Sequence, residues 1–142
     1  MSKPLARVLL VEDEPTMART IQVALNRQDI AVKLCGTGEE ALSILVTESF
    51  DLMVLDIHLP GMSGLDVVTE LAANPAFHQI PFIFITGDAS PANRKEAQRL
   101  GAADFLEKPL RLNAFVTCIR THLKLEPTRQ PKVPPAWQRK AA

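Results

Sequence analysis

The sequence has 142 residues, enough for a single domain with a sizeable core. Hydrophobic residues make up 46% of the chain and charged residues 23%, which argues against disorder over most of it. The formal net charge of zero gives no general attraction to nucleic acid or to an anionic membrane. The N-terminus lacks the apolar core of a signal peptide, and no apolar run reaches membrane-spanning length. We therefore expect a soluble, cytoplasmic protein that binds neither nucleic acid nor membrane directly.

Strand and helix patterns alternate along the first half of the chain. The apolar run 8–11 predicts a buried strand, and Pro15 opens a helix that continues to about residue 28. Alternating apolar residues over 30–35 predict an edge strand, and a capping-box pattern from Thr37 to Glu40 opens a second helix. The unbroken apolar run 52–55 then predicts a strand buried on both faces, which ends on Asp56.

The alternation continues in the second half. A turn rich in Gly and Pro follows Asp56, and Ser63 opens a helix that closes at Asn74-Pro75. Residues 82–85 predict a third buried strand, after which Ser90-Pro91 open a short polar helix ending near residue 100. Residues 103–107 predict a short strand, and apolar residues at helical spacing predict a last helix over 110–124.

Five strands alternating with five helices predict an α/β fold with a parallel sheet covered on both faces. We expect a flavodoxin-like (βα)5 sandwich with the strand order 2-1-3-4-5. In such a sheet, ligands bind at the carboxyl ends of the strands, at the crevice between the first and third strands. Three carboxylates should therefore converge on that crevice, namely those of Glu12, Asp13 and Asp56.

The composition changes at residue 126. Residues 126–142 contain four basic residues, one acid and frequent prolines, which predicts an extended tail or linker stub beyond a folded unit of residues 1–125. A docking segment anchored by Trp137 is the alternative reading of this tail. Cys35 and Cys118 lie far apart and have no metal-ligand spacing, so we expect buried free thiols.

The predicted carboxylate cluster favours a bound cation, because several carboxylates cannot remain ionised together without one. Oxygen ligands without His or Cys suit Mg²⁺, or Mn²⁺, and Mg²⁺ prefers sites that also receive phosphate oxygens. Thr86 and Lys108, at the ends of neighbouring strands, could contact a phosphoryl group, and Asp56 could accept it as an acyl phosphate. Taken singly, each residue has a plainer role, such as a favourable charge at a helix terminus or a solvated lysine.

Four motifs resemble those of the response-regulator receiver domain, the CheY-like phosphoacceptor module of two-component signalling. The resemblance extends from about residue 7 to residue 124. It rests on Val11-Glu12-Asp13-Glu14, Leu55-Asp56 with Leu59-Pro60-Gly61-Met62-Ser63-Gly64, Ile85-Thr86-Gly87 and Phe105-Leu106-Glu107-Lys108-Pro109. It implies Asp56 as the phosphorylation site and a Mg²⁺ ion held by Asp13, Asp56 and the backbone carbonyl of His58. Glu12 would act on the metal through water, and many members carry Asp at that position.

The resemblance also implies a switch. Thr86 and Phe105 would move on phosphorylation and remodel the face formed by residues 91–100, 103–107 and 110–124, which would bind a downstream protein or a second copy of the chain. The Lys108-Pro109 peptide would be cis. His58 and Asp88 would flank the attacking water and set the lifetime of the phosphoryl group. The phosphoryl donor would be a sensor histidine kinase or a histidine phosphotransfer protein, and the chain would assist its own phosphorylation rather than act as an enzyme on other substrates.

Two other functions fit this fold less well. A flavodoxin-type FMN carrier needs a hydroxyl- and glycine-rich turn after the first strand, where this chain has acids that would repel the cofactor phosphate. A phosphatase with an aspartate nucleophile commonly has a second acid two residues later, where this chain has His58. Within the receiver reading we favour a stand-alone domain, because no effector pattern follows Lys124; the alternative is the receiver part of a longer regulator.

Overall fold

The computed structural model describes residues 3–77 and 79–125. Strands and helices alternate strictly along these residues: β1 (Ala6–Val11), α1 (Pro15–Asn26), β2 (Ile30–Cys35), α2 (Gly38–Thr47), β3 (Leu52–Asp56), α3 (Gly64–Ala73), β4 (Phe82–Thr86), α4 (Pro91–Arg99), β5 (Asp104–Glu107) and α5 (Leu112–His122). The alternation confirms the predicted α/β class. The predicted tail over 126–142 lies outside the described residues.

The five strands form one parallel sheet in the order β2-β1-β3-β4-β5, as the sequence predicts. All strands point the same way, so their carboxyl ends meet at a single edge of the sheet. The register pairs Val11 of β1 with Leu55 of β3, and Asp56 with Ile85 of β4. Within the described residues, no helix is long and apolar enough to cross a membrane.

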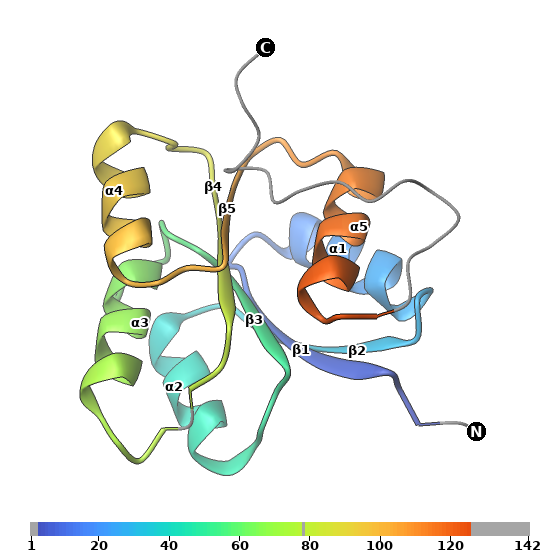
Figure 1. Cartoon of the computed structure of the whole chain (residues 1–142), viewed down its shortest axis with the longest axis horizontal. Helices are drawn as coiled ribbons and strands as arrows, with labels where there is room; N and C mark the ends of the chain where they lie inside the picture. The colour runs from blue at the N-terminus through green and yellow to red at the C-terminus, as the bar shows by residue number, and fades with distance from the viewer. Residues whose placement is uncertain (1–2, 78, 126–142) are drawn as a thin grey trace.

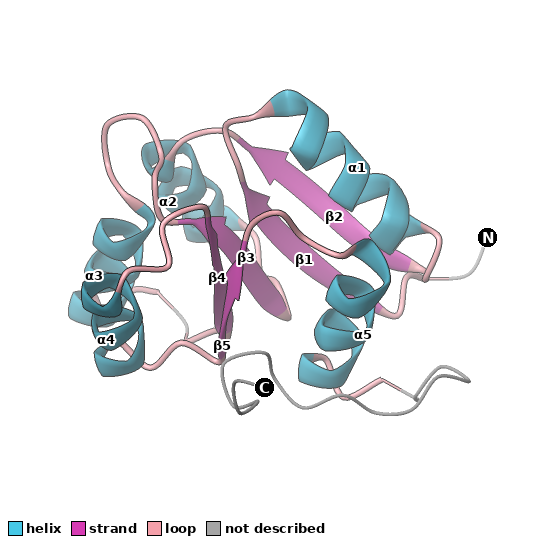
Figure 2. Cartoon of the chain, turned by 90° about the horizontal axis from the view of Figure 1, so that it is seen from above, coloured by secondary structure: helices cyan, strands magenta, loops and turns pink. Residues whose placement is uncertain are grey.

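The helices cover the sheet in two layers. Helices α2, α3 and α4 lie on one face, and α1 and α5 lie on the other (Figure 1). The view from above shows the same three-layer arrangement with the twisted sheet in the middle (Figure 2). Each helix connects two parallel strands by a right-handed crossover. The direction of each step along the sheet therefore decides which face the connecting helix covers.

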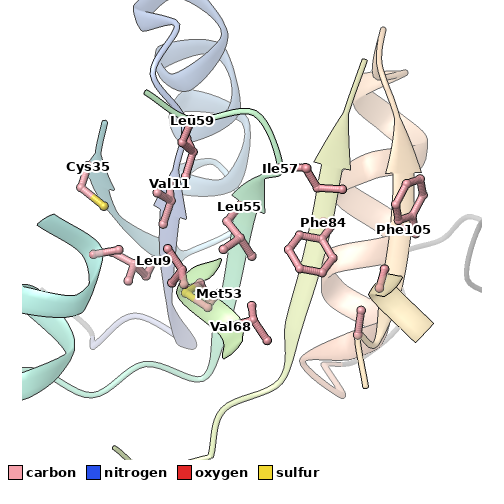
Figure 3. Close-up of a cluster of buried hydrophobic side chains, with 14 of the residues drawn as sticks. Leu9, Val11, Cys35, Met53, Leu55, Ile57, Leu59, Val68, Phe84 and Phe105 are labelled. Atoms are coloured by element: carbon pink, nitrogen blue, oxygen red, sulfur yellow. The ribbon is translucent and has the colours of Figure 1, made fainter. Parts of the chain in front are cut away.

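Each face of the sheet has its own hydrophobic core. Leu9 and Leu55 point toward α2, α3 and α4, and Figure 3 shows them together with Phe84 and Phe105 in that cluster. The residues next to them in each strand point to the opposite face, where Leu10 and Val54 pack against α1 and α5. Side chains alternate across a strand, so strands buried on both faces need the unbroken apolar runs seen in the sequence.

Side-chain caps fix the starts of three helices where the sequence predicts them. The Thr37 hydroxyl accepts a hydrogen bond from the Glu40 amide (3.1 Å) at the start of α2, and Ser90 does the same for Asn93 (3.2 Å) in α4. Ser63 forms a complete capping box with Asp66 at the start of α3. Each cap satisfies a backbone amide that the first helical turn leaves without a partner.

Some element ends differ from the predicted ones by one or two residues. The strand β1 begins at Ala6 rather than residue 8, because Ala6 and Arg7 pair with Ile30 and Ala31 of β2. The amide of Arg7 also donates to the side chain of Asp51 (2.8 Å). Helix α5 begins at Leu112 rather than residue 110, and its N-cap residue, Arg111, provides no side-chain cap. Long-range contacts of this kind leave no local pattern in the sequence.

Candidate functional site

The predicted site residues lie at the carboxyl edge of the sheet. Glu12 directly follows β1, Asp56 and Thr86 are the last residues of β3 and β4, and Lys108 directly follows β5. Because β1 is the neighbour of β3, the register places Glu12 next to Asp56. Glu12, Asp56 and Thr86 are all buried, which is unusual for two carboxylates and shows that the fold holds them in place.

The side chain of Lys108 joins the two carboxylates. Its Nζ atom lies 2.7 Å from Glu12 Oε1 and 2.6 Å from Asp56 Oδ2. The lysine side chain is 20% exposed, whereas the carboxylates of Glu12 and Asp56 are almost entirely buried. Charge-assisted hydrogen bonds in such a setting are strong, so the ammonium group fixes the spacing of the two acids. The Lys108-Pro109 peptide is cis, which is the isomer that the resemblance implies.

The turn after β3 packs tightly against Asp56. The amide of His58 donates to Asp56 Oδ1 (2.9 Å), so both carboxylate oxygens of Asp56 have a partner. The amide of Gly64 donates to the Ile57 carbonyl (2.8 Å), which closes the turn onto the strand. A Cβ atom on Gly64 would lie 2.2 Å from the carbonyl oxygen of Asp56, so a larger residue at this position would displace the backbone of the site.

Burial and the contacts among these ionisable groups alter two pKa values. Burial raises the pKa of Glu12 to about 7, since the hydrogen bond from Lys108, which lowers it, offsets only part of the burial effect and Asp56 raises it further. The pKa of Lys108 is also raised, because hydrogen bonds to Asp56 and Glu12 outweigh the lowering effect of burial. The electrostatics favour a second cation beside the lysine.

The acids fit a hard divalent cation. Glu12, Asp13 and Asp56 each offer a carboxylate oxygen, and these oxygens lie within 4.8 Å of one another. Glu12 Oε2 is buried without a hydrogen-bond partner among the residues that the structure describes. Buried oxygens are normally satisfied, and an all-oxygen donor set matches Mg²⁺ or Mn²⁺. The exposed side chain of Asp13 leaves an open side where water or a ligand oxygen could complete the coordination.

The loops after β3 and β4 touch each other beside these acids. His58 Nε2 lies 3.4 Å from Asp88 Oδ2, and both side chains are more than half exposed. The hydroxyl of Thr86 accepts a hydrogen bond from the amide of Asp88 (3.0 Å) and donates to its carbonyl (3.4 Å). Among the described residues, Thr86 forms no hydrogen bond with Asp56, so the two stand on adjacent strands without direct contact.

Phe105 points into the core and has a partner that the sequence did not reveal. The ring is 1% exposed, and the guanidinium of Arg94 from α4 lies 4.9 Å from its centroid. Arg94 also approaches Glu107 of β5, with 3.7 Å between Nη2 and Oε2. The arginine therefore bridges α4 and β5 over the aromatic ring. A single arginine in a polar helix gives no signal for this contact, which depends on the placement of β5.

Comparison with known proteins places the chain in a family. The family model for the response regulator receiver domain matches residues 8–120. A protein named as a probable cyclic di-GMP phosphodiesterase of Vibrio cholerae is 34% identical over 117 residues, which cover 82% of this chain and 26% of that protein. The chain spans between 26% and 56% of the length of eight curated relatives that it matches.

Solved structures show the same fold. The non-phosphorylated HemR receiver domain from Leptospira biflexa is 31% identical, with a TM-score of 0.76, and the match covers 87% of this chain and 98% of that one. The receiver domain of the sensor histidine kinase PA1611 from Pseudomonas aeruginosa, whose structure has a magnesium ion in its active-site cleft, is 24% identical with a TM-score of 0.75 and 84% and 98% coverage. The chain therefore belongs to the response regulator receiver domain family, the phosphoacceptor modules of two-component signalling.

Proposed function

We propose that Asp56 is the phosphoacceptor of this receiver domain. The observation that carries the proposal is the contact of one ammonium group, Lys108 Nζ, with both Asp56 (2.6 Å) and Glu12 (2.7 Å) at the carboxyl edge of the sheet. Asp56 is the central acid of this group, since it ends the middle strand and touches the lysine and the His58 amide at once. A nucleophile held from both sides needs little reorganisation to meet a phosphorus atom.

The transfer would be a single in-line displacement. One carboxylate oxygen of Asp56 forms a bond to phosphorus, while the bond from phosphorus to the imidazole nitrogen of a phosphohistidine donor breaks and its electron pair leaves with that nitrogen. Lys108 is placed to stabilise the negative charge on the equatorial oxygens. Bound Mg²⁺ would neutralise further charge on the phosphoryl oxygens.

We further propose that Glu12, Asp13 and Asp56 are the protein groups around that ion, together with the backbone carbonyl of His58. The unpartnered oxygen Glu12 Oε2 and the all-oxygen donor set support this assignment. The magnesium ion in the PA1611 receiver domain supports the choice of metal. Glu12 would act through a water molecule, and Mn²⁺ should substitute for Mg²⁺ because it accepts the same ligands.

The partners follow from this chemistry. The donor would be a sensor histidine kinase or a histidine phosphotransfer protein in the cytoplasm, and residues 1–125 would form the complete receiver unit. Phosphorylation would draw the Thr86 hydroxyl from the Asp88 backbone toward the phosphoryl group. The rearrangement would reach Phe105 and the face formed by α4, β5 and α5, which would then bind a downstream protein or a second copy of the chain.

The decisive experiment is phosphorylation by a small-molecule phosphodonor with Mg²⁺, followed by intact-protein mass spectrometry. The wild type should gain one phosphoryl group, and Asp56→Asn should gain none. Asp51→Asn is the matched control, because Asp51 is an exposed aspartate just before the other end of the same strand. An unmodified wild type, or an undiminished adduct on Asp56→Asn, would contradict the proposal.

We also propose that His58 and Asp88 set the lifetime of the phosphoryl group. Their 3.4 Å contact joins the loops that follow β3 and β4, beside the acid cluster, where we expect water to approach Asp56. Replacing either residue with Ala should therefore speed hydrolysis several-fold, measured as loss of the adduct after the donor is removed. If the pair acts as one unit, the double variant should decay no faster than the single variants. Unchanged decay in all three would exclude this role.

A further inference from the structure

A second cluster of metal-ligating side chains lies away from the acidic site, between β5 and α5. Asp104, Cys118 and His122 each offer one donor atom, and these atoms lie within 4.8 Å of one another. The Cys118 thiol lies 3.1 Å from Asp104 Oδ2, and His122 Nε2 lies 3.2 Å from the same oxygen. Their donors are a sulfur, a nitrogen and an oxygen, so this cluster differs in kind from the acids around Asp56.

The fold brings the three residues together in a regular way. Cys118 and His122 are four residues apart in α5, so both side chains lie on the same face of the helix. Asp104 is the first residue of β5 and points, like Leu106 two residues later, to the face of the sheet that α5 covers. The amide of Phe105 donates to Asp104 Oδ1 (2.8 Å), which leaves Oδ2 directed at the helix.

Two of the separations between donor atoms are close to those of a tetrahedral metal site. With ordinary zinc bond lengths, the ligand oxygen would lie about 3.4 Å from the imidazole nitrogen and about 3.6 Å from the sulfur. The observed distances of 3.2 Å and 3.1 Å therefore need an expansion of only a few tenths of an ångström. A hydrogen bond to a metal-ligating group commonly orients it, which is the role that the Phe105 amide has toward Asp104.

The cluster is largely shielded from water. The Asp104 side chain is fully buried, the His122 side chain is 13% exposed, and Cys118 is buried. His122, at the end of α5, gives a metal ion a route to these donor atoms from solvent.

We propose that Asp104, Cys118 and His122 bind a borderline-soft divalent metal ion of the Zn²⁺ class, with water as the fourth ligand. Thiolate and imidazole donors select such an ion over Mg²⁺, so the two sites of this protein hold different metals. Binding releases the thiol proton, and metal affinity therefore rises with pH. The site ties β5 to α5.

The test is titration of the purified full chain with Co²⁺ as a spectroscopic substitute for Zn²⁺, followed by competition with Zn²⁺. A thiolate ligand gives Co²⁺ a strong near-ultraviolet charge-transfer band, whereas Co²⁺ on the carboxylates of the acidic site gives none. In the wild type, we expect the intensity of this band to saturate at one equivalent of Co²⁺. The band should disappear when Zn²⁺ displaces the Co²⁺. Zn²⁺ should also raise the melting temperature of the protein.

Matched variants assign the band. The chain has two cysteines, so Cys118→Ser should abolish the band and Cys35→Ser should retain it. His122→Gln keeps the thiol and should weaken Co²⁺ binding by at least about 100-fold, since even an outer-sphere partner is worth about 10- to 100-fold. A wild type without the band would overturn the proposal even if a variant failed to fold. A band that survives Cys118→Ser, or that follows Cys35, would overturn it as well.

Discussion

Neutralising Glu12 should make the metal-free protein more stable at alkaline pH. Burial raises the pKa of this side chain to about 7, and Lys108 supplies one ammonium group for the two buried acids that it touches, Glu12 and Asp56. In Glu12→Gln the side chain keeps its shape and can still accept a hydrogen bond from Lys108, but it carries no charge. The substitution therefore removes one of two adjacent carboxylate charges without opening a cavity.

The magnitude follows from proton linkage. The pKa of Glu12 is about 7 in the folded protein against an ordinary value of 4.5, so between these pH values the folded state binds more protons than the unfolded state. Stability contributed by this group is therefore complete below pH 4.5 and is lost as the pH rises to about 7. The loss amounts to about 3 kcal/mol, at about 1.4 kcal/mol for each pH unit between the two values.

Chemical denaturation at a series of pH values, in the presence of a chelator, measures this difference. Glu12→Gln should exceed the wild type in unfolding free energy by up to about 3 kcal/mol near pH 8, and the difference should vanish toward pH 4.5. The control Glu14→Gln, at an exposed glutamate two residues away, should change stability by less than about 0.5 kcal/mol. A Glu12→Gln variant that is less stable than wild type near pH 8, or a difference that does not depend on pH, would refute the reasoning.

Three further substitutions test the contacts that hold the acidic site and the neighbouring helix α3 in position. Lys108→Met leaves two buried acids without their shared cation, so the free energy of unfolding near pH 8 should fall by about 3–5 kcal/mol. A denaturant titration measures this loss, and Mg²⁺ should restore part of it. Gly64→Ala places a Cβ atom 2.2 Å from the Asp56 carbonyl oxygen, so calorimetry should show both a lower melting temperature and weaker Mg²⁺ binding, and an unaltered protein would contradict the close approach. Ser63→Ala removes the capping box of α3 and should reduce stability by about 1 kcal/mol, whereas Ser63→Asp should retain most of it.

The sequence predicts the fold well because its patterns are local. Unbroken apolar runs identify the buried strands, and Thr37, Ser63 and Ser90 mark helix starts that the structure places at the same residues. Once the strand order is set, the carboxyl ends of the strands necessarily share one edge. The convergence of Glu12 and Asp56 could therefore be predicted without coordinates, and Lys108 joins them as a third member.

The contacts that the sequence did not predict all depend on which side chains meet across elements. Arg94 lies over Phe105 because α4 packs beside β5, and nothing in the pattern of the polar helix indicates it. Cys118 is buried, as predicted, and its neighbours Asp104 and His122 place it in a cluster of side chains that could hold a metal ion. The spacing of Cys118 and His122 in one helix was visible in the sequence, but the third donor comes from a strand.

The distance along the chain between the members of the acidic site has a consequence for signalling. Lys108 lies 96 residues from Glu12 and 52 residues from Asp56, so an unfolded chain holds no preassembled acceptor. If Asp56 is the acceptor, phosphoryl incorporation reports the folded fraction of the protein as well as the activity of the donor. A core substitution far from the site, with every site residue intact, would then reduce signal output once the population of folded molecules falls, by tenfold in the folding equilibrium for each 1.4 kcal/mol lost. The extent of phosphorylation would thus also indicate what fraction of the protein is folded.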